Sequence, residues 1–72
     1  MDFLQLFYFK TVAETNHITK AAKQLHISQP ALSQMIKKLE KELSVSLFQR
    51  QTKGVVLTDE GELFLEYAAK AL

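Results

Sequence analysis

The 72-residue sequence has no cysteine and no apolar run long enough to cross a membrane. The lack of cysteine excludes a disulfide framework, a thiolate metal site and a cysteine nucleophile. A membrane span needs about 20 consecutive apolar residues, and no stretch approaches that length. The N-terminus does not look like a signal peptide either, since Asp2 stands where a basic segment is expected. We therefore expect a cytoplasmic domain without a membrane partner.

The sequence also lacks an excess of charge of one sign. It has nine Lys and Arg and eight Asp and Glu, so the formal net charge is only +1. Hydrophobic residues make up 47% of the chain and charged residues 24%, which is typical of a folded domain and not of a disordered one. A chain this short buries only about 60% of its unfolded surface. Stabilisation by a partner is therefore expected.

The small net charge conceals an uneven distribution along the chain. Residues 1–18 carry a net charge of −1, residues 19–53 one of +5 and residues 54–72 one of −3. A basic middle between two acidic ends suggests one surface that faces an anion. The charge pattern alone leaves open the alternative of an ordinary solvated helix face.

Residues 2–15 are predicted to form a helix that is apolar on two sides. The first stripe holds Phe3, Leu6, Phe9 and Ala13, and the second holds Leu4, Phe7 and Tyr8. A surface helix needs only one apolar stripe. The second stripe is therefore expected to face a partner, and the alternative is a helix that runs through the middle of the domain.

A break at Asn16–His17 precedes a second, short helix. Thr19 is expected to cap this helix and residues 20–25 to continue it. The small residues Ala21 and Ala22 allow another helix to approach closely. A turn at 26–27 follows, in which Ile27 is expected to be buried.

A third helix is predicted from Ser28 to about Ser44. Ser28 is a favourable N-cap, and Pro30 lies in the first turn, where its missing N–H has no helical partner in any case. Glu40 and Glu42 flank the polar face, where surface ion pairing is their expected role. The apolar face holds Leu32, Met35, Ile36, Leu39 and Leu43, and the opposite face holds Pro30, Ser33, Gln34, Lys37 and Lys41.

Short strands are predicted at Leu47–Arg50 and Val55–Leu57, joined by a hairpin turn with Lys53 at its tip. Thr58 is expected to cap a fourth helix, whose two apolar stripes are Phe64, Tyr67, Ala68 and Ala71, and Leu65, Ala69 and Leu72. The helical pattern continues to the last residue, which predicts that these residues are a domain of a longer protein.

Two helices joined by a tight turn, with a polar and cationic outer face on the second, form a helix-turn-helix. An α-helix fits the major groove of DNA, and its N-terminal residues reach base edges. Gln29 and Gln34 each offer the donor and acceptor that suit adenine, Ser33 can contact either polar edge, and Pro30 can touch a thymine methyl. Lysines further along the helix suit phosphates, and the hairpin forms a wing.

The run AAKQLHISQPALSQMIKKLE at residues 21–40 resembles the signature of the LysR-type transcriptional regulators. The segments LFQR at 47–50 and LTDEG at 57–61 are similar to that family, as are the apolar positions near the N-terminus. The resemblance covers the whole chain, and the motif Ser-Gln-Pro-Ala-Leu-Ser is specific.

This resemblance implies a mainly α fold with a winged helix-turn-helix, a three-helix core plus a short β-hairpin wing, in residues 1–57. Residues 58–72 would begin a linker or dimerisation helix. The recognition helix, about 28–44, would read double-stranded DNA at an inverted-repeat operator, with the wing on the adjacent backbone or minor groove. The linker helix would form a homodimer, the full-length protein a tetramer, and a small-molecule effector would bind a further domain.

The site residues follow from the resemblance and from the apolar stripes. Base contacts are expected from Gln29, Pro30, Ser33 and Gln34, and backbone or wing contacts from Thr19, Ser28, Lys37, Arg50 and Lys53. Dimer contacts are expected from Leu4, Phe7, Phe64, Leu65, Tyr67, Ala68 and Leu72.

The sequence departs from the family pattern at several positions. Ser44 stands where glycine usually ends the recognition helix, which is unfavourable if the residue is left-handed. Gln34 replaces a frequent arginine, which shifts the expectation from guanine toward adenine or water-mediated readout. His17 replaces a common serine, and the wing has one fewer cation than in many members.

No enzyme, metal or cofactor is expected. His17 and His26 are nine residues apart and have no carboxylate or cysteine companions, and Ser33 has no partner base. The alternative from another class is a winged-helix protein–protein interaction module, in which the +5 segment would dock an acidic partner.

Overall fold

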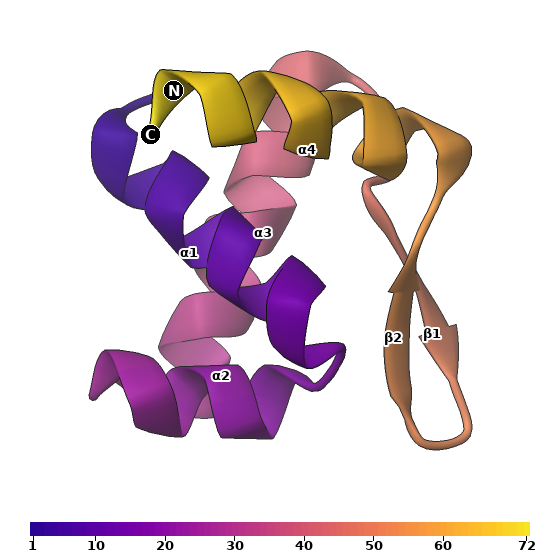
Figure 1. Ribbon diagram of the computed structural model, residues 1–72. Coiled ribbons are helices and arrows are strands. Elements are labelled where there is room, and N and C mark those ends of the chain that lie inside the picture. Colours follow the sequence, from indigo (N-terminus) through magenta and orange to yellow (C-terminus); the bar gives the residue numbers. More distant parts are fainter.

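The computed structural model describes all residues from 1 to 72 as four helices and one antiparallel hairpin (Figure 1). In chain order the elements are α1 (Phe3–Thr15), α2 (Ile18–Leu25), α3 (Gln29–Leu43), β1 (Phe48–Gln51), β2 (Gly54–Leu57) and α4 (Asp59–Ala71). The first three helices pack together, α4 lies across α1, and the hairpin stands to one side as a wing. The predicted fold class is confirmed. None of the helices has the length and hydrophobicity needed to cross a membrane.

Each helix begins at a side chain that accepts a backbone N–H. The predicted caps are confirmed, with Ser28 Oγ 3.1 Å from the nitrogen of Ala31 and Thr58 Oγ1 2.9 Å from that of Gly61. The prediction that Thr19 caps α2 is wrong. His17 has the extended backbone of a cap, and its Nδ1 accepts the N–H of Lys20 at 3.4 Å, so the helix begins before Thr19.

Three helices end at left-handed residues that are not glycine: Asn16, His26 and Ser44, with φ of 56°, 58° and 58°. Each of these residues donates its N–H back to the last turn of the helix that it ends. For most residues the left-handed conformation costs about 1–2 kcal/mol, and asparagine tolerates it best because its short side chain can bond locally. Serine at the end of α3 therefore carries the cost that glycine would avoid.

The core is centred on Phe9, which joins α1 to the hairpin and to α4. Its ring is fully buried, and its centroid lies 5.4 Å from that of Phe48 and 5.0 Å from that of Phe64. Aromatic pairs at such distances add about 0.5–1.5 kcal/mol beyond the area they bury. The other large side chains that are fully buried come from α1, α3 and the start of the hairpin: Val12, Leu32, Leu39 and Leu47.

The two apolar stripes of α1 differ from the prediction in which residues they bury. Phe3 was expected in the core stripe but is 65% exposed, because it is the first residue of the helix and lies a full turn before the first core residue, Leu6. Leu4 and Phe7 of the second stripe are 49% and 45% exposed. α1 therefore does not run through the middle of the domain, and its second stripe faces outward.

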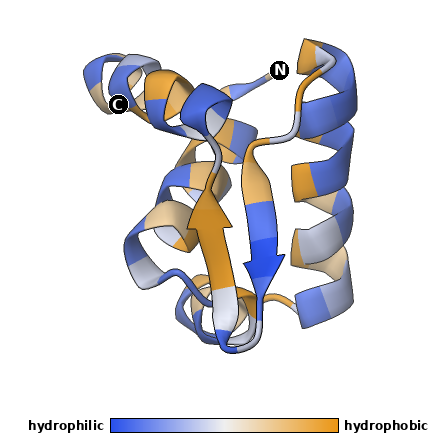
Figure 2. Cartoon of the chain, turned by 90° about the vertical axis from the view of Figure 1, so that its right-hand side faces the viewer, coloured by the Kyte–Doolittle hydropathy of each residue, from blue (hydrophilic) through white to orange (hydrophobic).

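Both strands of the hairpin begin one residue away from their predicted starts. β1 begins at Phe48 and not at Leu47, and β2 begins at Gly54 and not at Val55. Phe48 pairs with Leu57 and Gln51 with Gly54, so the turn consists of Thr52 and Lys53. Leu47 was expected in the strand but lies outside the ladder. Figure 2 shows that β1 is hydrophilic over most of its length, whereas β2 is mostly hydrophobic. Val55 of β2 is part of the core, and Leu57 packs against it.

The two carboxylates of α3 hold other parts of the chain, and neither forms the expected ion pair within its helix. Glu40 Oε2 accepts the backbone N–H groups of Leu47 and Phe48 at 2.7 and 3.3 Å. This contact fixes the start of the wing to α3.

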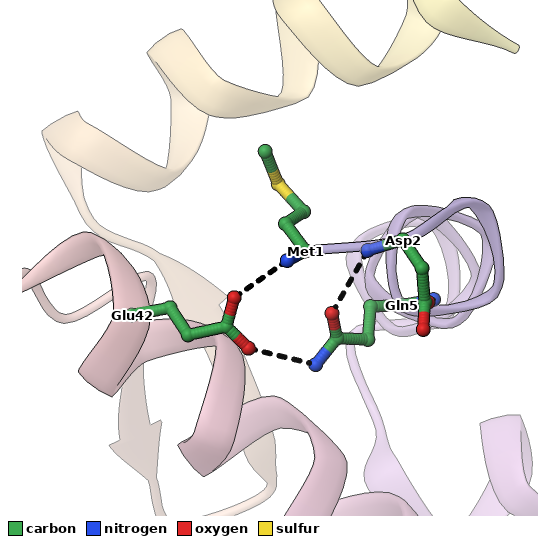
Figure 3. A network of polar contacts seen from close by, with 4 residues as sticks. All are labelled: Met1, Asp2, Gln5 and Glu42. Carbon is green, nitrogen blue, oxygen red and sulfur yellow. Dashed lines mark hydrogen bonds and ion pairs between the residues drawn. The ribbon is translucent and has the colours of Figure 1, made fainter.

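Glu42 accepts from the amino group of Met1 at 2.6 Å and from Nε2 of Gln5 at 3.4 Å (Figure 3). The same Gln5 completes the capping box with Asp2 at the start of α1. These contacts, the amino group first and Gln5 second, hold the pKa of Glu42 below its ordinary 4.5. The lowered pKa means that the contribution of Glu42 to stability is present above pH 4.5 and is lost as the pH falls through the folded-state pKa.

Ser44→Gly should stabilise the domain, because glycine adopts the left-handed conformation without strain. After subtraction of the greater chain entropy of glycine in the unfolded state, we expect a gain of about 0.5–1 kcal/mol and a Tm higher by several degrees. Thermal and denaturant unfolding measure both. Ser46→Gly, at a nearby exposed serine without positive φ, is the matched control and should give no gain. A lower stability for Ser44→Gly would contradict the left-handed conformation of residue 44.

Candidate nucleic-acid interface

The helix-turn-helix consists of α2, a short turn and α3. Ala21 and Ala22 are buried, so the two helices approach closely. At the turn, left-handed His26 donates its N–H to Lys23, and Ile27 donates to the carbonyl of Ala22 at 3.1 Å. Ile27 is half-buried against the core and not fully enclosed as expected. These contacts fix the angle at which α3 leaves the turn.

One side of α3 is apolar and buried, and the opposite side is polar and open to solvent. We define the reading face as Gln29, Pro30, Ser33, Gln34 and Lys37. Pro30, Gln34 and Lys37 are exposed, whereas Gln29 and Ser33 are half-buried. The Nε2 group of Gln29 donates to Oγ of Ser33 at 2.7 Å. The face begins at the N-terminus of the helix, where the Ser28 hydroxyl is occupied as the cap.

The outer part of the wing is fixed to the end of α1. The carbonyl of Asn16 accepts the N–H of Val55 at 3.0 Å, and Nδ2 of Asn16 donates to the carbonyl of Val55 at 3.2 Å. Gly54, with φ of +112°, passes so close that a Cβ atom there would lie 2.3 Å from the Asn16 carbonyl oxygen. Only glycine therefore allows this approach.

The base of the wing is fixed to α3 and α4. Two backbone N–H groups of the wing already donate to Glu40. In addition, the carbonyl of Leu47 accepts the N–H of Thr58 at 3.0 Å, and Oγ1 of Thr58 donates to the carbonyl of Ser46 at 2.6 Å. A Cβ atom on Gly61 would lie 2.1 Å from the Leu47 carbonyl oxygen. The wing is thus held at both ends.

Two clefts lie between the wing and the helix-turn-helix. Ser33, Lys37 and Glu40 line the first and Thr19 and Gln29 the second, and Arg50 lines both. Five of the predicted site residues are thereby brought together: Thr19, Gln29, Ser33, Lys37 and Arg50. Lys53 lies apart from them at the exposed tip of the wing, and Pro30 and Gln34 lie on the open part of α3.

The cations of this region are free of carboxylate partners. The only ion pairs in the chain are those of Met1 with Glu42 and of Lys10 with Glu14. Lys37, Arg50 and Lys53 therefore form no ion pair. The one carboxylate in the first cleft, Glu40, is bound to backbone N–H groups. His17 and His26 serve as helix caps, and no group of three potential metal-ligating side chains is present.

The residues expected at a dimer interface lie in different environments. Leu4, Phe7, Tyr67 and Leu72 are 39–53% exposed, but Phe64 and Leu65 pack partly against the core. Ala68 is fully buried in the chain's own core and offers no surface to a second chain. It was wrongly assigned, because it lies on the side of α4 that covers α1.

One exposed apolar region was not predicted from the sequence. Leu63 is 72% exposed and lines a shallow apolar groove with Leu43, Val45 and Tyr67 between the end of α3 and α4. Leu63 belongs to neither predicted stripe of α4. Its exposure was detectable only once the core-facing side of the helix was known.

Residues 3–62 match the family of bacterial regulatory helix-turn-helix proteins of the lysR type. The chain belongs to the LysR family. It is 54% identical over all 72 residues to the HTH-type transcriptional regulator BudR of Klebsiella aerogenes, of which it covers 50%. It is 50% identical to ClcR of Pseudomonas putida, of which it covers 24%. The chain thus spans half or less of these LysR-family relatives.

Solved structures similar to this LysR-family chain include complexes with DNA. The DNA-binding domain of CbnR bound to DNA superposes with a TM-score of 0.94 at 44% identity, over 99% of this chain and 82% of that one. The DNA-binding domain of BenM bound to catB site 1 DNA gives 0.93 at 44% identity, over 99% and 76%. The resemblance inferred from the sequence is therefore confirmed.

Gly54→Ala should detach the outer wing from α1, because a Cβ would collide with the Asn16 carbonyl and an L-residue is strained at this φ. We expect a loss of about 2–4 kcal/mol of unfolding free energy, measured by denaturant unfolding. Thr52→Ala, in the exposed turn two residues away, should change stability by less than about 0.5 kcal/mol. Equal stability of the two variants would show that the close contact is absent.

Proposed function

We propose that this LysR-family chain binds double-stranded DNA in a sequence-specific manner, with α3 in the major groove and the wing on the adjacent backbone or minor groove. The observation that carries the proposal is the set of side chains around the two neighbouring clefts, with no carboxylate in an ion pair with the cations: Gln29, Ser33, Lys37 and Arg50. An α-helix fits the major groove. The close likeness to domains crystallised with DNA supports this docking.

The residues of this surface would make two kinds of contact with DNA, to base edges and to phosphates. Gln29, Pro30, Ser33 and Gln34 form the part that reads base edges, since they lie on the first turns of α3, which enter the groove. Phosphates would be bound by Lys37 further along the helix and by four residues elsewhere on this surface: Thr19, Ser28, Arg50 and Lys53. The N-terminal half of α3 would thus specify the sequence, and the rest would set register and orientation.

The same proposal extends to assembly. Residues 1–57 form the winged helix-turn-helix, and residues 58–72 begin a linker helix that pairs with a second copy. The exposed apolar side chains available for this are Leu4, Phe7, Leu63, Tyr67 and Leu72. Two copies would read an inverted repeat, since the symmetry of a dimer matches that of its site. A longer chain would form a tetramer and carry a further domain that binds a small-molecule effector. Such a protein would regulate transcription in the cytoplasm and would catalyse no reaction.

Substitutions on α3 should separate specificity from general affinity. Gln29→Ala should relax the preference at one base pair at a cost of about 1–3 kcal/mol, because a base-edge contact is lost. Lys37→Ala should weaken all duplexes alike and flatten the dependence of log K on log salt by about one, because a phosphate contact is lost. Titration of a duplex chosen from a randomised library, and of its single-base variants, at two salt concentrations measures both.

Uniform effects of both substitutions would mean that the base-reading residues are misassigned. Salt-independent binding, or no binding of any duplex, would overturn the proposed function. Equal binding of heparin and duplex DNA would instead favour the alternative, a module that docks acidic proteins through its basic segment.

Self-association should depend on the apolar side of α4. In sedimentation over a range of concentrations, the chain should shift from monomer to dimer, and Tyr67→Ser should move the transition to higher concentration. Glu62→Ser, at an exposed polar position of the same helix, should not. A monomer at every concentration would show that the exposed stripes of α1 and α4 do not pair in this chain.

A further inference from the structure

The side chains of Gln29 and Ser33 are coupled to one another before any DNA is bound. They are four residues apart on α3, a spacing that places them side by side on one helix face. The distance from Nε2 of Gln29 to Oγ of Ser33 is 2.7 Å, and neither side chain has another hydrogen bond. Both residues are half-buried, Ser33 in the cleft with Lys37 and Arg50 and Gln29 in the neighbouring one.

This bond restricts what the Gln29 amide can offer to a ligand. A glutamine amide has one carbonyl acceptor and two N–H donors. With one N–H held by Ser33, the acceptor and a single N–H remain free. The oxygen of Ser33 accepts this bond, and the O–H of Ser33 is left to donate elsewhere.

The remaining pattern matches one base in the major groove. Adenine presents an acceptor at N7 beside a donor at N6, which a single acceptor and donor can satisfy together. Guanine presents two acceptors, N7 and O6, which require two donors. The Gln29 amide can supply two donors only by giving up its bond to Ser33.

We propose that Ser33 acts through Gln29, as a positioning residue that orients the Gln29 amide for adenine and against guanine. The inference rests on the proposed function, because it assumes that the reading face meets base edges. Its physical basis is preorganisation: an amide that is fixed before binding loses less freedom on binding and presents one orientation only.

Ser33→Ala should lower the preference for adenine over guanine at the Gln29 position by about twofold to tenfold, the equivalent of one neutral hydrogen bond. The preference at every other base pair should remain unchanged. Ser33→Thr keeps a hydroxyl and should restore the preference. Ser46→Ala, at an exposed serine whose side chain makes no hydrogen bond, is the matched control. The probe is a duplex selected from a randomised library with the unmodified 72-residue chain, together with its single-base variants.

A double-mutant cycle distinguishes positioning from direct readout. If Ser33 acts through Gln29, Ser33→Ala should have no further effect on specificity in a chain that already carries Gln29→Ala. A loss of preference at a different base pair, which persists in the Gln29→Ala background, would overturn the proposal and make Ser33 a direct reader. Unchanged specificity of Ser33→Ala would overturn it too.

Replacement of the contacted adenine by 7-deazaadenine tests the ligand side, because this base lacks the N7 acceptor. The unmodified chain should lose affinity for the modified duplex, whereas Gln29→Ala should bind both duplexes equally. An equal loss for both chains would contradict the assignment to Gln29. If the library yields no preferred sequence, the proposed function and this inference fail together. If a preferred site is found but Ser33→Ala reads it unchanged, only the inference fails.

Discussion

The attachment of the wing to the end of α1 is the constraint on which the rest of the surface depends. An isolated two-stranded hairpin is only marginally stable in water, and this one has four residues in each strand. Asn16 bonds Val55 through both its carbonyl and its amide, while Gly54 allows the backbones to meet. The left-handed conformation that ends α1 therefore also aims the Asn16 groups at the wing. One residue thus ends a helix and places a hairpin.

The base of the wing and the core complete the same arrangement. Glu40 holds the start of β1 to α3, and the Phe9 ring packs against Phe48 of the wing and Phe64 of α4. The wing is consequently fixed relative to the recognition helix, and Arg50 borders clefts that Gln29 and Lys37 line from the other side. A fixed spacing between these groups is what a duplex of regular groove dimensions requires.

The sequence predicted the parts of this fold that depend on local chemistry. Ser28 and Thr58 cap their helices, and the left-handed Ser44 lies where the family pattern has glycine. Predictions failed where a distant contact decides the outcome. Glu40 binds backbone N–H groups across a loop instead of a nearby lysine, and the role of Asn16 depends on a strand 39 residues away. The burial of Ala68 likewise depends on packing that periodicity does not identify. The His17 cap is a local contact, to Lys20, but histidine is not among the residues preferred as caps. The roles of the predicted reading residues remain predictions.

Amide chemical-shift mapping reports which surface of the chain meets DNA. The isotope-labelled chain would be titrated with a duplex selected from a randomised library. We expect the largest shifts in residues 28–38 and 50–54, on the reading face and the wing, with smaller shifts along the outer side of α4. Shifts concentrated on the exposed apolar side chains of α1 and α4, with the reading face unchanged, would contradict this expectation.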